Sequence, residues 1–308
     1  MSAKIQIPEE LKADMPQNTW GKVLAATPIV MTVIATLLAG LSSGEMTRAQ
    51  YDRALAAQLQ SKAGDQWNYF QAKKLRAALQ RNTLDVIASS APVRPLEADA
   101  LSARLASSAG KTPGNPATIE ILAHGNLPAL PPDAHPLDAR IVGILSAVDA
   151  GQTDAEIAAM VSRIKGADLA AALRAAGDRV RASDALLKPV TQSIDAMEKE
   201  LGRTPSDPLS RDFVVARLNF AAMRYDSESR QNQVIAQLYE LQVRQSNVSA
   251  ERHHLRSQRF FYGMLAAQLA VIMSTFSMAA RKHNFLWALA ATAGTAALAF
   301  AAYVYLFI

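Results

Sequence analysis

The sequence contains no cysteine among its 308 residues. Disulfide bonds, thiolate catalysis and a lipid-modified cysteine are therefore excluded, on whichever side of a membrane the chain lies. No stretch of useful length alternates apolar and polar residues, as a half-buried β-strand would. These absences predict an all-α chain.

Charged residues are missing from three long blocks, residues 23–41, 260–280 and 285–308. As helices these blocks would be roughly 28, 31 and 36 Å long, against a bilayer hydrocarbon core of ~30 Å. A buried core helix is the alternative reading, but core helices of this length normally keep one polar stripe. The blocks therefore predict three transmembrane helices in a multi-pass membrane protein.

Aromatic side chains lie at the ends of these blocks, where amphipathic rings prefer the lipid headgroup level. They are Trp20, Phe260, Phe261, Tyr262, Phe285, Trp287, Tyr303 and Tyr305. The N-terminal tail, residues 1–22, contains acidic residues, and no Ala-x-Ala site follows the first block. This pattern favours a retained anchor over a cleaved signal peptide.

The chain between the first two spans indicates long helices separated by a proline-rich region. Residues 42–88 are predicted as a stalk helix that continues the first span. Eight prolines mark residues 89–136 as a loop region with short helices at 96–108 and 117–123. Residues 137–205 are predicted as a helical tip. Small or apolar residues recur every seventh position of the stalk helix: Ala49, Ala56, Ala63, Phe70, Ala77 and Leu84.

Local signals predict several helix ends. Thr153 and Glu156 have the spacing of a capping box. Pro189 predicts a kink or break in a helix over 167–201. The Asp207-Pro208 pair predicts an N-cap followed by proline at the first helical position.

The second stalk helix, residues 208–259, has no further proline before the end of the second span. A short basic loop, residues 281–284, joins the second and third spans. The predicted fold class is thus an all-α membrane protein with three transmembrane helices, a long coiled-coil-like helical stalk and a helical extramembrane domain.

Residues 65–73, Asp-Gln-Trp-Asn-Tyr-Phe-Gln-Ala-Lys, resemble the D-Q-W-x-Y-x-Q-A-K motif of an uncharacterised bacterial membrane-protein family, known only as a domain of unknown function. A second matching region runs from Tyr239 to Met264. Members are similar in having one N-terminal span, a helix with the motif, a charged helical middle and two C-terminal spans. The resemblance covers residues 20–85 and 210–308, and implies a bacterial inner (plasma) membrane but no activity, cofactor or catalytic residue.

The motif predicts a packing surface more readily than a ligand site. On a helix Asp65, Tyr69 and Lys73 lie on one face, so that each can reach the next. The Lys74 amine can stack on the Phe70 ring from another face. The candidate packing or interaction residues are Asp65, Trp67, Tyr69, Phe70 and Lys73.

Basic residues before the second span predict contact with lipid phosphates. The candidate headgroup contacts are Arg252, His253, Arg256 and Arg259. Adjacent helical residues such as His253 and His254 point about 100° apart and cannot chelate one ion together. We therefore expect no metal, and no cofactor is implied. The charges of the middle region are well mixed, which argues against nucleic-acid binding.

No Ser-His-Asp arrangement or paired acids rise above chance, so catalysis is not expected. The first hypothesis is a membrane-anchored structural or interaction protein. Its predicted partners are the lipid bilayer, a second copy in a homo-oligomer, and an unidentified membrane or periplasmic protein. The alternative is an accessory or pore-forming subunit of a transport assembly, lined by Thr27, Thr32, Thr36 and Gln268. A membrane-bound hydrolase has no sequence support.

Basic residues in short segments predict the topology. The N-terminal tail and the 281–284 loop together hold five Lys and Arg residues, and the C-terminal end holds none. This places the tail and loop in the cytoplasm and the large domain in the periplasm. Six basic residues on the domain side of the spans favour the opposite orientation, so both remain open: Arg48, Arg53, Arg244, Arg252, Arg256 and Arg259.

Overall fold

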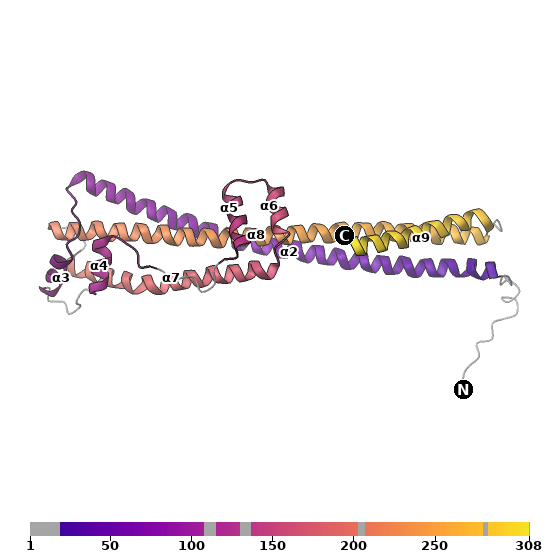
Figure 1. Cartoon of the computed structure of the whole chain (residues 1–308), viewed down its shortest axis with the longest axis horizontal. Coiled ribbons are helices and arrows are strands. Elements are labelled where there is room, and N and C mark those ends of the chain that lie inside the picture. Colours follow the sequence, from indigo (N-terminus) through magenta and orange to yellow (C-terminus); the bar gives the residue numbers. More distant parts are fainter. Residues whose placement is uncertain (1–18, 108–114, 130–136, 203–206, 280–282, 308) are drawn as a thin grey trace, which may run out of the picture. The chain divides into compact units, whose positions relative to one another are not determined.

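The computed structural model describes residues 19–107, 115–129, 137–202, 207–279 and 283–307. All regular structure within these ranges is helical, which confirms the predicted all-α class (Figure 1). The helices are α2 (Thr19–Ser90), α3 (Ala98–Ser107), α4 (Pro116–His124), α5 (Ala139–Asp149), α6 (Asp154–Val161), α7 (Gly166–Leu201), α8 (Pro208–Ala279) and α9 (His283–Phe307). The N-terminal tail up to residue 18 and residues 281 and 282 of the basic loop lie outside the described residues.

The chain divides into two compact units. We call residues 1–55 and 246–308 the span unit, and residues 56–245 the polar unit. Helices α2 and α8 are each continuous and contribute to both units.

Three helices are long and apolar enough to cross a membrane, as the sequence predicted. Their apolar segments lie within Ala25–Ser90 of α2, Pro208–Ser277 of α8 and Phe285–Leu306 of α9. Many large apolar side chains of the span unit face outward, including Ile29, Leu37, Phe276, Phe285 and Leu306. Such surfaces suit contact with lipid and would be costly in water.

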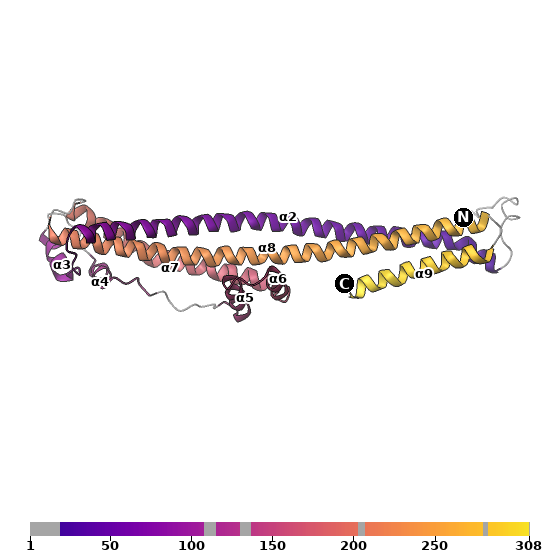
Figure 2. The ribbon, with the colours of Figure 1, turned by 90° about the horizontal axis from the view of Figure 1, so that it is seen from above.

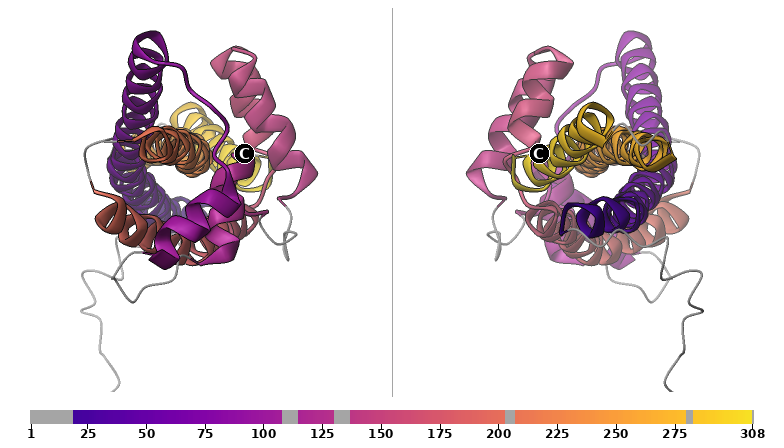
Figure 3. Two further views of the ribbon diagram at one scale, coloured as in Figure 1. Left: turned by 90° about the vertical axis from the view of Figure 1, so that its left-hand side faces the viewer. Right: turned by 90° about the vertical axis from the view of Figure 1, so that its right-hand side faces the viewer.

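The inner faces of the span unit consist mainly of small residues. In α8 they are Gly263, Ala267, Ala270, Ser274 and Ser277, all buried, at alternating spacings of four and three. The matching positions are Met31, Ala35 and Leu38 in α2, and Ala290, Gly294, Ala297 and Val304 in α9. Small residues let helix backbones approach closely within a membrane. Figure 3 shows the three helices end-on.

In the polar unit α7 lies antiparallel to α8 (Figure 2). Near one end Arg217 of α8 contacts Glu198 of α7 at 3.0 Å. Near the other end the Gln245 amide of α8 donates to the Ile164 carbonyl, just before α7, at 2.6 Å. Helix α7, which belongs to the 137–205 segment predicted as a helical tip, therefore lies along α8 within this unit.

Two apolar clusters hold the shorter helices to this pair. The first joins α3 and α4 to α7 and α8 through Leu101, Leu122, Ile194 and Phe213. The second joins α5 and α6 to the same two helices and contains Ile144, Val161, Leu169, Leu238 and Leu241. Burial of these aliphatic and aromatic side chains supplies about 1.5–3 kcal/mol each.

Local sequence explains the helix ends. The side chain of Asn115 accepts from the Ala117 amide before Pro116, and Gly125 ends α4 in the left-handed conformation. The capping box predicted at Thr153 and Glu156 is present in α6. The α8 helix begins as predicted, with the Asp207 carboxylate accepting from the Ser210 amide at 2.7 Å.

The helix α7 continues through Pro189, so the break that the sequence suggested there is absent, and the alternative of a kink stays a prediction. The proline lies on the exposed side of the helix. Water can therefore satisfy the carbonyl group that loses its amide partner, while the neighbouring Leu187 and Val190 stay buried.

Candidate interaction sites

The motif residues of α2 lie at its contact with α8 in the polar unit, and divide between two faces. The Trp67 indole Nε1–H donates to Glu240 Oε1 at 2.7 Å. The Lys73 ammonium group pairs with the Glu228 carboxylate. Asp65 and Tyr69 are exposed. Trp67 and Lys73 thus bind α8, while the other two side chains face solvent.

Ring contacts support the α8-facing side of the motif. The Trp67 and Phe70 rings are edge-to-face, with centroids 5.4 Å apart. The Lys74 amine lies 5.4 Å from the Phe70 ring centroid, which is the stacking that the spacing predicted. The local path from Asp65 through Tyr69 to Lys73 does not form, because Lys73 has a carboxylate partner on another helix.

Glu228 is the centre of a charge network that the sequence did not reveal. Besides Lys73 of α2, it binds Arg224 of α8, whose Nε lies 3.2 Å from Glu228 Oε1. Arg224 Nη1 in turn donates to Thr191 Oγ1 of α7 at 2.8 Å. The network therefore connects three helices of the polar unit.

The ring of Tyr225 lies against the same cations. It is 4.7 Å from the Arg224 guanidinium carbon and 5.4 Å from the Lys73 nitrogen. Cations over an aromatic face gain electrostatic energy from the ring quadrupole. A shallow groove of about 490 Å³ borders this network, lined by Thr191, Arg224 and Glu228 among others.

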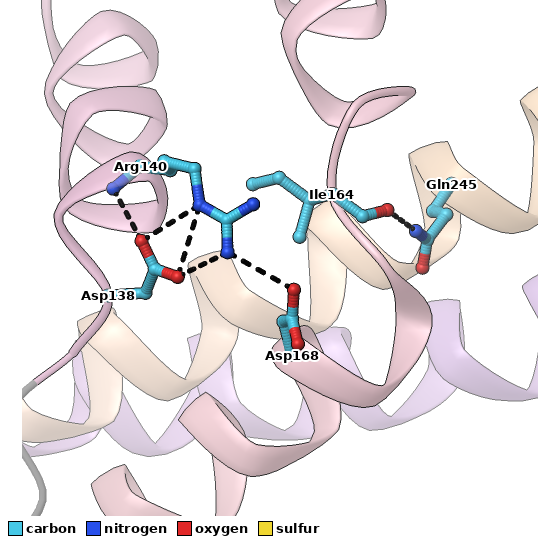
Figure 4. Close-up of polar contacts among 5 residues, drawn as sticks. All are labelled: Asp138, Arg140, Ile164, Asp168 and Gln245. Atoms are coloured by element: carbon cyan, nitrogen blue, oxygen red, sulfur yellow. Dashed lines mark hydrogen bonds and ion pairs between the residues drawn. The ribbon is translucent and has the colours of Figure 1, made fainter.

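A second charged cluster joins the start of α5 to the start of α7 (Figure 4). Arg140 bridges two carboxylates, with Nη2 2.5 Å from Asp138 Oδ2 and 3.3 Å from Asp168 Oδ2. Hydrogen bonds from the Arg140 side chain and amide hold the pKa of Asp138 below its ordinary value. Asp138 also caps α5 by accepting from the Arg140 amide at 2.8 Å. The cluster orients two helix starts.

A polar contact joins α2 to α8 within the span unit. The Ser42 hydroxyl donates to the Ser257 carbonyl at 2.9 Å, and the Ser257 hydroxyl donates to the Ser42 carbonyl at 2.8 Å. One turn further, Glu45 Oε2 lies 2.5 Å from His253 Nδ1. The side chain of Glu45 is only 12% exposed, so this carboxylate depends on its partners His253 and Arg48.

The basic residues predicted as headgroup contacts lie around this polar contact. His253 points inward to Glu45, whereas Arg252 is exposed, and Arg256 and Arg259 are half-buried. Contact with lipid phosphate stays a prediction for the three arginines. The sequence offered one signal for the inward contact, because Glu45 is the first acidic residue after the uncharged block of the first span.

The described residues contain no group of three or more His, Cys, Asp or Glu side chains that could hold a metal ion. Glu45, Asp138, Asp168 and Glu228 are paired with cationic or histidine side chains, and Glu240 accepts a hydrogen bond from the Trp67 indole. These arrangements hold helices together.

Residues 20–114 match a family model described as a domain of unknown function (DUF4337). No curated protein and no solved structure matches the chain. The matched region contains α2 with the motif at residues 65–73, and α3. The second region of the sequence resemblance, in α8, lies beyond this match and stays a prediction. The N-terminal third of the chain is thus the part that matches an uncharacterised domain family, as the motif indicated.

Proposed function

We propose that this protein is a membrane-anchored helical scaffold that presents its polar unit to other proteins. The main support is that two motif side chains of α2 bind α8: Trp67 binds Glu240, and Lys73 binds Glu228. A motif that joins two helices of the same chain supports a structural role.

The span unit supports the anchoring part of this proposal. Its outward faces are apolar, and its inner faces are small. The Ser42–Ser257 and Glu45–His253 contacts fasten α2 to α8 where the uncharged segments end. A helix pair fastened in this way resists separation, which a scaffold that bears load from a bound partner requires.

We further propose that the membrane is the bacterial inner membrane and that the polar unit faces the periplasm. The support is the count of basic residues in the short segments. Single cysteines at positions 46 and 283 test the orientation, since the chain has no native cysteine. In intact cells a membrane-impermeant thiol reagent would label the cysteine at 283 and spare the one at 46 if the polar unit faced the cytoplasm. That result would contradict the proposed orientation.

The pore alternative, with Thr27, Thr32, Thr36 and Gln268 as its lining, stays a prediction. The hydroxyls of Thr27, Thr32 and Thr36, expected to line a pore, donate to carbonyls one turn earlier in their own helix. Each hydroxyl proton thus has a partner within its own helix, while each hydroxyl oxygen can still accept a hydrogen bond.

The scaffold proposal is tested by photo-crosslinking in living cells. A photoreactive residue replaces Val142 on α5 or Leu186 on α7, two large apolar side chains exposed in the polar unit. The matched control replaces Ile272, an exposed apolar residue of α8 in the span unit. We expect one defined set of protein adducts at 142 or 186 that is absent at 272. Adducts that are the same at all three positions, or none at 142 and 186, would contradict the proposal.

A further inference from the structure

The helix α2 has a second apolar face in the polar unit, opposite the face that packs on α8. Leu75, Leu79 and Val86 are 62%, 53% and 67% exposed. With Ala72 and Asn82, which are also exposed, they form a row with spacings of three, four, three and four residues. We call these five residues the outer seam.

The inner face of the same helix is already occupied. Ala56, Ala63 and Ala77 are buried. Their spacings are multiples of seven residues, so all three occupy the same heptad position. In the same heptad frame the outer seam occupies the two positions that form the contact line of a coiled coil, and the inner alanines lie directly opposite. One face of α2 thus has its partner, and the other has none among the described residues.

Single exposed apolar residues are normal, but a contiguous row over successive turns indicates a contact surface. Lipid is an unsuitable occupant, because Arg76, Arg81 and Asp85 flank the row. The alternating spacing of three and four residues fits another straight helix that runs along α2 over a length of several turns. The row is accessible because its side chains are exposed, and in Figures 1 and 3 the end of α2 that holds it also diverges from α8.

We propose that the occupant is the outer seam of a second copy of this chain, with the two α2 helices parallel. This inference rests on the proposed membrane anchoring, because two copies anchored in one membrane with the same orientation bring their α2 helices together in parallel. Each seam residue then faces its own equivalent. A side-chain amide is both donor and acceptor, so Asn82 can bond to the Asn82 of the second copy and fix the register.

The charges of the helix are compatible with this pairing. No ionisable residue occupies the contact line between Asn68 and Ser89. In a parallel pair the flanking positions would bring Gln71 near Arg76, and Asp85 near Ser90, so no like charges meet. An antiparallel pair centred on the leucines would instead bring Arg76 against its own equivalent.

The contact has a natural limit at Asp65, which falls on the same line one heptad before Ala72. Two facing aspartates would repel each other, so the contact extends over three heptads, or about 33 Å of helix. A contact of this length is weak in isolation. Anchoring in a common membrane raises the effective concentration of the two helices, and so allows a short seam to pair.

Cysteine crosslinking of the full-length protein in native membranes tests the proposal. Cysteines replace Leu75 and Asn82 on the outer seam in separate single variants. The matched controls are Lys74→Cys and Arg81→Cys, which are also exposed and lie one position away from the seam. Under mild oxidation we expect disulfide-linked dimers at 75 and 82, at least about tenfold faster than at 74 and 81. Equal rates at all four positions, or no dimer at 75 and 82, would overturn the proposal.

A second variant separates the seam from folding and from the scaffold role. Leu79→Lys places a charge on the seam, and in the Asn82→Cys background it should slow crosslinking about tenfold or more. Its helical content should not change, because Leu79 is exposed in the single chain. An unchanged crosslinking rate would refute pairing through the outer seam. If the variant stops dimerisation but keeps the protein adducts at 142 or 186, the scaffold function stands without the dimer. If dimers form but these protein adducts do not, the pairing through the outer seam is supported and the scaffold function is refuted.

Discussion

Glu228 should be the most important single charge for the stability of the polar unit. Its side chain is 13% exposed and binds Lys73 and Arg224, which are 28% and 19% exposed. Removing one partner of a fully buried pair costs about 3–5 kcal/mol, and an exposed pair contributes about 0–1 kcal/mol. Because both cations keep some contact with water, we expect Glu228→Gln to destabilise the polar unit by about 2 kcal/mol.

Urea unfolding in detergent measures this loss, with Trp67 as the reporter. Trp20 and Trp287 are the other tryptophans of the chain, and both are replaced by Phe so that fluorescence reports the polar unit alone. With a slope of about 2 kcal/mol per molar urea, the midpoint should fall by about 1 M. The matched control is Asp178→Asn, which breaks the Asp178–Arg181 pair, where both side chains are mostly exposed. We expect the control to shift the midpoint by at most about a quarter as much.

A double-mutant cycle shows whether the loss comes from the network. Lys73→Met and Glu228→Gln should be less destabilising together than the sum of the two single changes, by about 1 kcal/mol or more. The reasoning is refuted if Glu228→Gln is no more destabilising than Asp178→Asn, or if the two changes at the network are additive.

Three further changes test other parts of the structure. A Cβ at Gly294 would clash with the Met31 Cε and Sδ atoms, which are the flexible end of that side chain. We therefore expect Gly294→Ala to be tolerated, whereas Gly294→Leu should lower the thermal midpoint of the span unit. Equal midpoints for the two variants would contradict the close contact. Thr153→Ala should lower the free energy of unfolding by about 1 kcal/mol, because it removes the α6 cap. The control is Thr83→Ala, at an exposed position inside α2. Equal effects of the two changes in urea unfolding would contradict the cap. Hydrogen bonding to the Ser210 amide holds the pKa of Asp207 below its ordinary value, so the cap stabilises the folded state above about pH 4 and this stability is lost as pH falls through the lowered pKa. The difference in unfolding free energy between the wild type and Asp207→Asn should therefore shrink below about pH 4. A difference that stays constant with pH would contradict the assignment.

The features that the sequence predicted well are those that depend on neighbours along the chain. The capping residues Thr153 and Asp207 act on amides within three residues, so their spacing is sufficient to identify them. The three apolar helices follow from runs of uncharged residues in the same way. Pro189 is a partial exception, because the helix continues through it without a break, while a kink there stays a prediction.

The features that the sequence did not reveal are contacts between distant residues. Spacing placed Lys73 beside Tyr69, but its partner is Glu228, 155 residues away in the chain. Likewise Glu45 and His253 are 208 residues apart. Periodicity identifies which side of a helix is apolar, but the partner across the interface follows only from the register of the two helices. The same limit explains why α7 was not expected along α8.

The central claim, that α8 crosses a membrane and anchors the polar unit, is tested most directly by thiol accessibility along the chain. Single cysteines at positions 46, 272 and 283 are labelled with an impermeant maleimide, first in intact cells and then in inverted membrane vesicles. We predict that 46 and 283 are labelled from opposite sides, and that 272, within the uncharged segment of α8, is labelled from neither. Labelling of 46 and 283 from the same side, or ready labelling of 272, would contradict the account.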